Sequence, residues 1–465
     1  MSILGAIMVP HPPLIIPEVG KGEEQQISTT IDSYKRAAEF VLSKQPDTVI
    51  VTTPHSVIYG DYFHISPGRH AKGDFGNFGA PQVKVEADYD LDFTIALESL
   101  ADAKEFPLGT FGERNPALDH ATMIPLYFME QADPEAYKKI KVIRLGLSGL
   151  PLVEHYRLGM MIAQVSEELG RKVVMIGSGD LSHKMKKEGP YGFAKEGPEY
   201  DDRIMDVMGR AAFGELLSFD DLFCEKAAEC GHRSFVIMAG ALDGLAVTPG
   251  EATHEATFGV GYGVCTYDVT GEDENRCFLA LWEAEQKERL RKAREFEDPY
   301  VKLARFSLES YVIDRKKIKR PEELPRDMTE RKAGTFVSLH KHGELRGCIG
   351  TIGPVQENIA EEIIENAISA ATRDPRFRPV QASELPELEI SVDVLGEMEP
   401  ISGKEELDVI RYGVVVENGM RRGLLLPNLE GVDTVEEQIA IAKRKAAIPE
   451  NEPVKMYRFE VVRHV

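Results

Sequence analysis

The hydrophobic positions in the first two-thirds of the chain form short continuous runs, and stretches with helical periodicity separate them. Continuous apolar runs are typical of strands buried on both faces of a sheet, and their alternation with helices is typical of parallel sheets. Strands are predicted at Ile3–Val9, Thr48–Thr53, 140–147 and the start of 172–183, and helices around 25–43 and 151–169. The pattern therefore predicts an α/β sandwich with helices on both faces of its sheet.

Two features interrupt or end this alternation. The glycine-rich stretch 68–81 is long enough to predict an active-site flap in the form of a loop. Residues 254–269 are expected to form closing strands with glycine bends. The composition then becomes charged and helix-forming, and a smaller α+β pattern follows it. The predicted domains are 1–270 and 296–465, joined by a helical linker at 271–295.

Length and charge exclude several classes of protein. With 465 residues, of which 43% are hydrophobic, the chain is long enough for two or three globular domains. No apolar stretch approaches the ~20 residues that span a bilayer. A formal charge of −22 disfavours general binding to nucleic acids or anionic membranes. The five cysteines show no CxxC spacing, which argues against a disulfide framework or a thiolate zinc site and indicates a reducing cytoplasm.

Three histidines follow predicted strands at equivalent places. His11 lies between Pro10 and Pro12, which exclude a regular helix and stiffen the loop after the first strand. His55 follows the second strand, and His183 follows a later one. Ligands bind open α/β sheets at the carboxyl ends of the parallel strands, so these side chains are expected to share one site.

The chemistry that two imidazoles can perform depends on a third group. Two histidines and one carboxylate suit a non-haem Fe(II) site with open positions, whereas three histidines suit zinc, which is the less favoured alternative. Glu229 precedes an apolar helix and offers a carboxylate, and His120 starts another amphipathic helix. The residues alone leave the third group open.

Four segments carry a family resemblance: His11 in PHPP, His55 in TPHS, His120 in LDHATMIPL and His183 in GDLSH. Together they resemble class III extradiol ring-cleaving dioxygenases, the LigB-like family, over about residues 1–270. The resemblance implies an Fe(II) ion bound by two histidines and a glutamate, here His11, His55 and Glu229, with His183 and His120 as acid and base groups. It also implies a catechol-type aromatic diol and dioxygen as substrates, and a homo-oligomer as the assembly.

The segment ECGH resembles a related group, the Memo family, whose members carry a cysteine at the equivalent turn. Cys230 is therefore the alternative to Glu229 beside the metal. Two other functions stay open on the same residues. One is a non-catalytic iron-binding or scaffold protein that serves a radical-SAM enzyme, and the other is a hydrolase that uses zinc-bound water.

The second domain carries LRGCIG within the turn-rich segment 343–353, together with ATRDPRFRPV and DPYVKLAR. These motifs resemble the AMMECR family over about residues 296–465. Arg346 is a candidate for pairing with an anion, and Cys348 is a candidate reactive thiol, although a structural role for both stays open. Related AmmeMemoRadiSam systems pair AMMECR and Memo-type modules with a radical-SAM protein, which is thus the expected partner.

Overall fold

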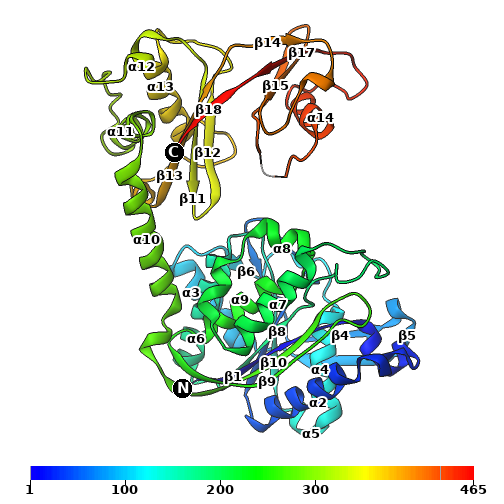
Figure 1. Cartoon of the computed structure of the whole chain (residues 1–465). Coiled ribbons are helices and arrows are strands. Elements are labelled where there is room, and N and C mark those ends of the chain that lie inside the picture. Colours follow the sequence, from blue (N-terminus) through cyan, green and yellow to red (C-terminus); the bar gives the residue numbers. More distant parts are fainter. Residues whose placement is uncertain (1, 430) are drawn as a thin grey trace. The chain divides into compact units, whose positions relative to one another are not determined.

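The computed structural model describes residues 2–429 and 431–465. The chain forms two compact units, Met1–Glu283 and Ala284–Val465, called here the first and the second unit (Figure 1). The division falls within helix α10, Phe278–Phe296. None of the helices formed by the described residues has both the length and the apolar character that crossing a membrane requires.

The first unit is built on one six-stranded sheet with the order β7-β2-β8-β1-β10-β9. Its strands are β1 (Ile3–Val9), β2 (Thr48–Thr53), β7 (Lys141–Gly146), β8 (Val173–Ser178), β9 (Leu245–Glu255) and β10 (Tyr262–Glu272). The first four are parallel, and β10 and β9 close one edge in antiparallel pairs. Every residue of β2 and β8 is buried, which explains their continuous apolar sequences and confirms the predicted α/β class.

Helices cover both faces of this sheet. Because side chains alternate along a strand, Ile7 of β1 packs against α2 (Ser28–Ser43) and α4 (His120–Ala132). The next residue, Met8, belongs to the opposite core with α3 (Leu91–Ala103), α6 (Leu152–Leu169), α7 (Glu196–Gly209) and α9 (His232–Ala241). The sandwich predicted from the strand–helix alternation is therefore present.

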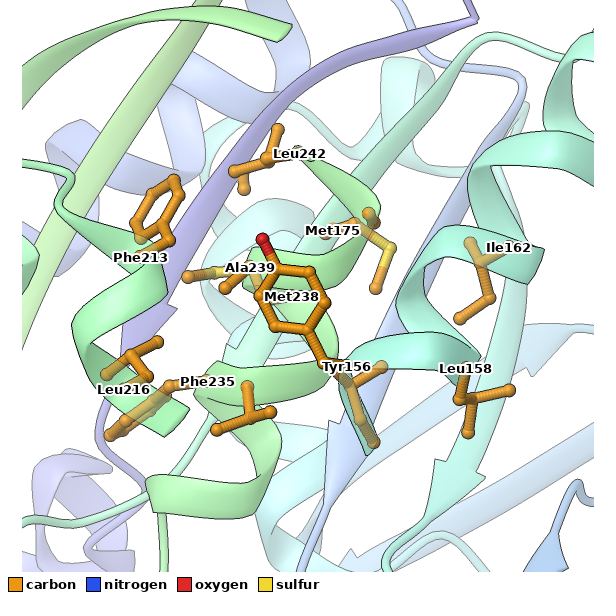
Figure 2. Close-up of a cluster of buried hydrophobic side chains, with 14 of the residues drawn as sticks. Tyr156, Leu158, Ile162, Met175, Phe213, Leu216, Phe235, Met238, Ala239 and Leu242 are labelled. Carbon is orange, nitrogen blue, oxygen red and sulfur yellow. The ribbon is translucent and has the colours of Figure 1, made fainter. Parts of the chain in front are cut away.

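Helices α6 and α9 pack closely, as Figure 2 shows around Tyr156. A methyl group added at Gly240 would lie 2.0 Å from the carbonyl oxygen of Tyr156, so only glycine allows this approach. The Tyr156 hydroxyl donates to Asp243 Oδ1 at 2.7 Å, which satisfies its polar end. Phe235 and Met175 fill the space between α9 and the sheet.

The stretch 68–81 is not the loop predicted from its glycines. Strands β4 (His70–Phe75) and β5 (Ala80–Asp88) form an antiparallel hairpin across the short helix η3 (Gly76–Phe78). Alternate residues of β5 are buried, which is the pattern of a strand with one covered face. Gly79 at φ +82° makes the turn, so the glycines serve hairpin geometry rather than a loop.

The remaining elements of the first unit are short. They are β3 (Phe63–His64), β6 (Leu108–Gly109), α1 (Pro17–Gly20), α5 (Pro134–Tyr137) and α8 (Asp221–Ala227), with 3-10 helices at Pro13–Ile15, Glu23–Ile27, Phe213–Ser218 and Glu274–Arg276.

The second unit contains two four-stranded antiparallel sheets, ordered β12-β11-β13-β18 and β14-β17-β15-β16. Its strands are β11 (Thr335–Lys341), β12 (Glu344–Gly350), β13 (Leu388–Leu395), β14 (Glu399–Ile401), β15 (Gly413–Asn418), β16 (Arg421–Leu425), β17 (Lys455–Phe459) and β18 (Val461–His464). Its helices are α11 (Pro299–Asp314), α12 (Arg326–Glu330), α13 (Ile359–Thr372) and α14 (Val435–Lys445), with 3-10 helices at Ala382–Glu387 and Lys404–Glu406. Helices α11 and α13 pack on the first sheet and α14 on the second, as expected of an α+β domain.

Most of the segment predicted to be turn-rich, 343–353, is strand β12, paired with β11. Its glycines allow close packing instead of turns. A methyl group at Gly347 would lie 2.3 Å from the carbonyl oxygen of Ala370 in α13, and one at Gly350 would lie 2.3 Å from the ring of Phe336. The prediction of turns holds at Gly343, which lies in the turn between β11 and β12 at φ +86°, but not along β12, because glycine density signals close approach as well as chain reversal.

Candidate metal centre

Three histidine side chains converge at one edge of the first unit's sheet. His11, His55 and His120 each offer a ring nitrogen, and these nitrogens lie within 4.8 Å of one another. The Nε2 atoms of His11 and His55 are 3.0 Å apart, and the rings of His55 and His120 are 4.2 Å apart between centroids. Among the described residues, this is the one group of three or more histidine, cysteine or acidic side chains arranged to hold a metal ion.

The sheet order explains the convergence. Strand β8 lies between β2 and β1, so His55 and His11, each two residues past a strand end, face each other across the end of β8. His120 is the first residue of α4, whose N-cap is Asp119. The Asp119 carboxylate accepts from the Thr122 backbone at 3.0 Å and from the Thr53 hydroxyl at 2.7 Å. It therefore ties the start of α4 to the end of β2.

The hydrogen bonds of His11 select one tautomer. The Ser178 hydroxyl donates to the carbonyl oxygen of Ala121 at 2.8 Å, so it accepts from His11 Nδ1–H at 3.2 Å. The Nε2 atom is then unprotonated and faces His55. The backbone N–H of His11 donates to Asp180 Oδ1 at 2.7 Å and fixes the loop. This arrangement presents a free lone pair, as a metal ligand requires.

The histidines at this edge are held neutral. Burial, together with the neighbouring ring of His55, lowers the pKa of His120 to about 4. Burial, followed by the charges of His55, His120 and His183, places the pKa of His11 well below its usual value. The pKa values of His55 and His183 are also lowered, chiefly by burial. Neutral imidazole is the form that binds a metal, so the set is prepared for one near pH 7.

His183 and Cys230 border the three histidines. The half-buried ring of His183 stacks on Tyr191 at 5.0 Å between centroids. His183 contributes to the lowered pKa of His11, and His55 contributes to the lowered pKa of His183. The Cys230 Sγ atom lies 3.5 Å from His11 Nε2. Burial raises the pKa of Cys230 well above its usual value, which keeps the thiol protonated without a metal.

Glu229 has a different neighbour. Its Oε2 atom accepts from the backbone N–H of His232 at 2.6 Å, at the start of α9, and burial raises its pKa to about 7. The structure therefore brings Cys230 next to His11, whereas the Glu229 carboxylate satisfies a helix terminus. The assignment of Glu229 as a ligand stays a prediction.

A cavity of about 670 Å³ lies beside the three histidines. His55 and His120 contribute to its wall, and the hairpin β4–β5 forms another wall through Lys72, Asp74 and Phe78. The ring of Phe78 meets that of His120 edge-on at 5.2 Å. The segment predicted to be a flap thus lines this cavity, although it is a hairpin.

Sequence reasoning missed Ser178 and Asp119, which position His11 and His120. An aspartate directly before a helix is the usual signal of an N-cap, so Asp119 was recognisable. Ser178 ends a fully buried strand, and a hydroxyl at such a position needs a polar partner.

The two candidates of the second unit lie in internal contacts. Arg346 forms a two-bond ion pair with Glu384, at 2.8 and 3.0 Å. The backbone N–H of Cys348 donates to Asp374 Oδ2 at 2.9 Å, and its Sγ accepts from the Ser338 hydroxyl at 3.2 Å. Burial raises the pKa of the Cys348 thiol. These contacts occupy Arg346 within the chain, and its binding role stays a prediction.

An α/β sheet with histidines gathered at the carboxyl ends of its parallel strands defines a class of metal-site proteins. The model of the catalytic LigB subunit of aromatic ring-opening dioxygenase matches residues 5–265, and the AMMECR1 model matches residues 301–464. The chain belongs to the LigB family and carries an AMMECR1 domain behind the LigB domain. The LigB and AMMECR resemblances predicted from sequence motifs are confirmed.

Some relatives match the whole chain, and others match about a third of it. Protein CA_C1420 of Clostridium acetobutylicum is 40% identical over 481 residues, covering 100% of this chain and 99% of its own. A protein of Thermotoga maritima is 54% identical over 170 residues, covering 36% of this chain and 98% of its own. The solved structure of uncharacterized protein PH0010 from Pyrococcus horikoshii is 35% identical, with a TM-score of 0.35, and covers 36% of this chain and 90% of its own.

Proposed function

We propose that the first unit is a non-haem Fe(II)-dependent extradiol-type dioxygenase that opens the ring of a small catechol-type diol. The observation that carries this proposal is the group of His11, His55 and His120, of which His55 and His120 line the wall of a 670 Å³ cavity, on a LigB-family fold. A cavity of this size lies within the ~300–1,000 Å³ range of small-molecule sites.

The donor set fits a divalent transition metal. Neutral imidazoles suit Fe(II) and Zn(II), and the fixed tautomer of His11 leaves its Nε2 free. We therefore propose that His11, His55 and His120 hold the ion, with His120 in place of the carboxylate that the family resemblance implies. When bound, Fe(II) supplies open positions for the diol oxygens and for dioxygen.

The protein's own groups have separate tasks in this proposal. His183 is neutral, half-buried and close to the metal-binding histidines, so its imidazole can accept a proton from a diol hydroxyl. Tyr191 holds the His183 ring by stacking. Phe78 and its hairpin cover one side of the cavity and limit the access of water.

The test combines metal analysis with oxygen uptake. Protein purified without oxygen is expected to hold about one Fe(II) per chain and to consume dioxygen with a member of a catechol panel. The His11→Ala/His55→Ala double variant should lose both, whereas His70→Gln, on the outer part of the hairpin, should keep both. Stoichiometric zinc without oxygen uptake, or iron retained by the double variant, would refute the proposal.

A second candidate function rests on Cys230. A thiol, not a carboxylate, lies 3.5 Å from His11 Nε2, which favours a non-catalytic iron-binding or scaffold protein that serves a radical-SAM partner. This function requires Cys230→Ser to weaken iron binding more than Glu229→Gln does, without oxygen uptake on any diol. The dioxygenase proposal expects uptake in the unmodified protein.

A further inference from the structure

A second cavity, of about 350 Å³, lies entirely within the second unit. The end of α10 forms one side through Leu290 and Arg294, and residues of β13 such as Ile390 form another. Its wall is apolar in part, and the polar part includes three guanidinium groups, those of Arg294, Arg305 and Arg463, beside Glu297, Glu389, His340 and Ser391. This mixture is typical of sites for small molecules with one charged end.

The acidic side chains around this cavity are already paired, each with its own arginine. Hydrogen bonds of 2.5–3.1 Å hold three pairs: three bonds join Glu297 to Arg305, and two bonds each join Glu389 to Arg289 and Asp393 to Arg463. Arg294 is the arginine of the wall that has no carboxylate within 4.0 Å among the side chains that the structure describes. The cavity thus contains one guanidinium without a counter-charge in contact.

Two N–H donors in this wall lack acceptors. The Nε atom of Arg294 and the Nη1 atom of Arg305 are buried, and neither has a hydrogen-bond partner. Arg294 makes one bond, from Nη2 to the carbonyl oxygen of Leu385 at 2.6 Å. Glu309 approaches Arg305 Nη1 only to 3.9 Å, which is too long for a hydrogen bond. Buried charged donors are normally satisfied, so two guanidinium groups of this wall are left incompletely paired within the chain.

We propose that this cavity binds a small organic oxyanion, a carboxylate or a phosphate monoester, whose oxygens accept from Arg294 and Arg305 and whose apolar body contacts Leu290 and Ile390. A guanidinium matches both kinds of oxyanion through charge-assisted hydrogen bonds. The site lies in the second unit, which carries the AMMECR1 domain, and is independent of the function proposed for the histidine centre.

Calorimetric titration of the full chain tests the site with three probes of similar shape: benzoate, phenyl phosphate and the neutral benzamide. Benzoate or phenyl phosphate is expected to bind and benzamide is not. The anion that binds more tightly shows whether the site prefers a carboxylate or a phosphate monoester. Arg294→Gln should weaken anion binding by at least about tenfold. Arg294→Lys keeps the charge without Nε, so its affinity should lie between those of the unmodified chain and Arg294→Gln. Arg291→Gln is the matched control, because Arg291 is exposed on the same helix and pairs with Glu288.

Three outcomes would overturn the proposal. The first is that neither anion binds at millimolar concentration, which would mean that the cavity holds only water. The second is that the folded Arg294→Gln and Arg294→Lys proteins bind the anion as tightly as the unmodified chain does. The third is that anion binding is lost in the His55→Ala variant but kept in the Arg294→Gln variant, which would place the anion at the histidine centre.

Discussion

The two units gather functional side chains in different ways. In the first unit, parallel strands β1, β2 and β8 are neighbours and end at one edge, so residues just past them must meet. In the second unit, the cavity wall combines the end of α10 with antiparallel strands, and no shared position in the chain unites its members. A parallel sheet makes its site readable from strand ends, whereas an antiparallel α+β domain does not.

The units also differ in the chemistry they expose. The histidine centre of the first unit is neutral and suited to a cation, whereas the cavity of the second unit presents arginines and is suited to an anion. Perturbations directed at one unit should therefore leave the other unchanged.

The largest expected effect comes from the first unit's core. Phe235 is fully buried between α9 and the sheet, so Phe235→Ala should destabilise this unit by ~3–5 kcal/mol. Urea unfolding followed by hydrogen exchange of peptides from each unit would measure it. Val462→Ala, at an exposed position of β18, is the control and should change stability by less than ~0.5 kcal/mol. Equal loss of protection in both units would show that they unfold as one, contrary to this comparison.

The next largest expected effect is a loss of stability of the first unit at acidic pH. His155 is fully buried, its Nδ1 lies 3.1 Å from the carbonyl oxygen of Pro151, and burial lowers its pKa to about 3. In the unfolded chain the pKa of His155 is ~6.5, so this histidine takes up a proton below about that pH only when the chain unfolds. The contribution of neutral His155 to the stability of the folded unit is therefore complete above pH ~6.5 and is lost as the pH falls toward the pKa of the folded state. From about pH 7 to about pH 5 the loss is ~2 kcal/mol for His155 alone.

The same urea and exchange experiment on metal-free protein measures this effect. Peptides of the second unit serve as the internal reference, because His155 lies in the first unit. A His155→Gln variant should remove part of the pH dependence of the first unit. A pH dependence confined to the second unit would contradict the assignment.

Much of the first unit could be predicted, and the reason is burial on two faces. Strands β1 and β2 occupy the predicted residues because their apolar runs end at prolines or polar turns. The choice between Glu229 and Cys230 could not be predicted. These two residues follow Ala228, which adopts φ +54°, and side chains of successive residues in such a turn point in different directions.

The second unit's cavity was beyond sequence reasoning for another reason. Arg294 lies on a helix rich in exposed charges, among them Arg291, and nothing in their spacing separates a buried guanidinium from a solvated one. The LRGCIG motif was conspicuous, yet Arg346 pairs with Glu384 inside the unit. Pairing between side chains distant in sequence decides which arginine stays available.

The last prediction concerns the hydrogen bond that orients His11. Ser178→Ala removes the acceptor of Nδ1–H and frees the other tautomer, so Fe(II) affinity should fall ~10–100-fold while folding persists. Anaerobic competition with a chromophoric chelator measures the affinity. Ser166→Ala is the matched control, because Ser166 is equally buried but donates to Ile162 within α6. If the two variants bind Fe(II) alike, the tautomer of His11 is set by something other than Ser178, and the strand ends alone organise the centre. If Ser178→Ala alone weakens binding, the edge of the parallel sheet provides the ligands and the polar residue ending β8 orients one of them.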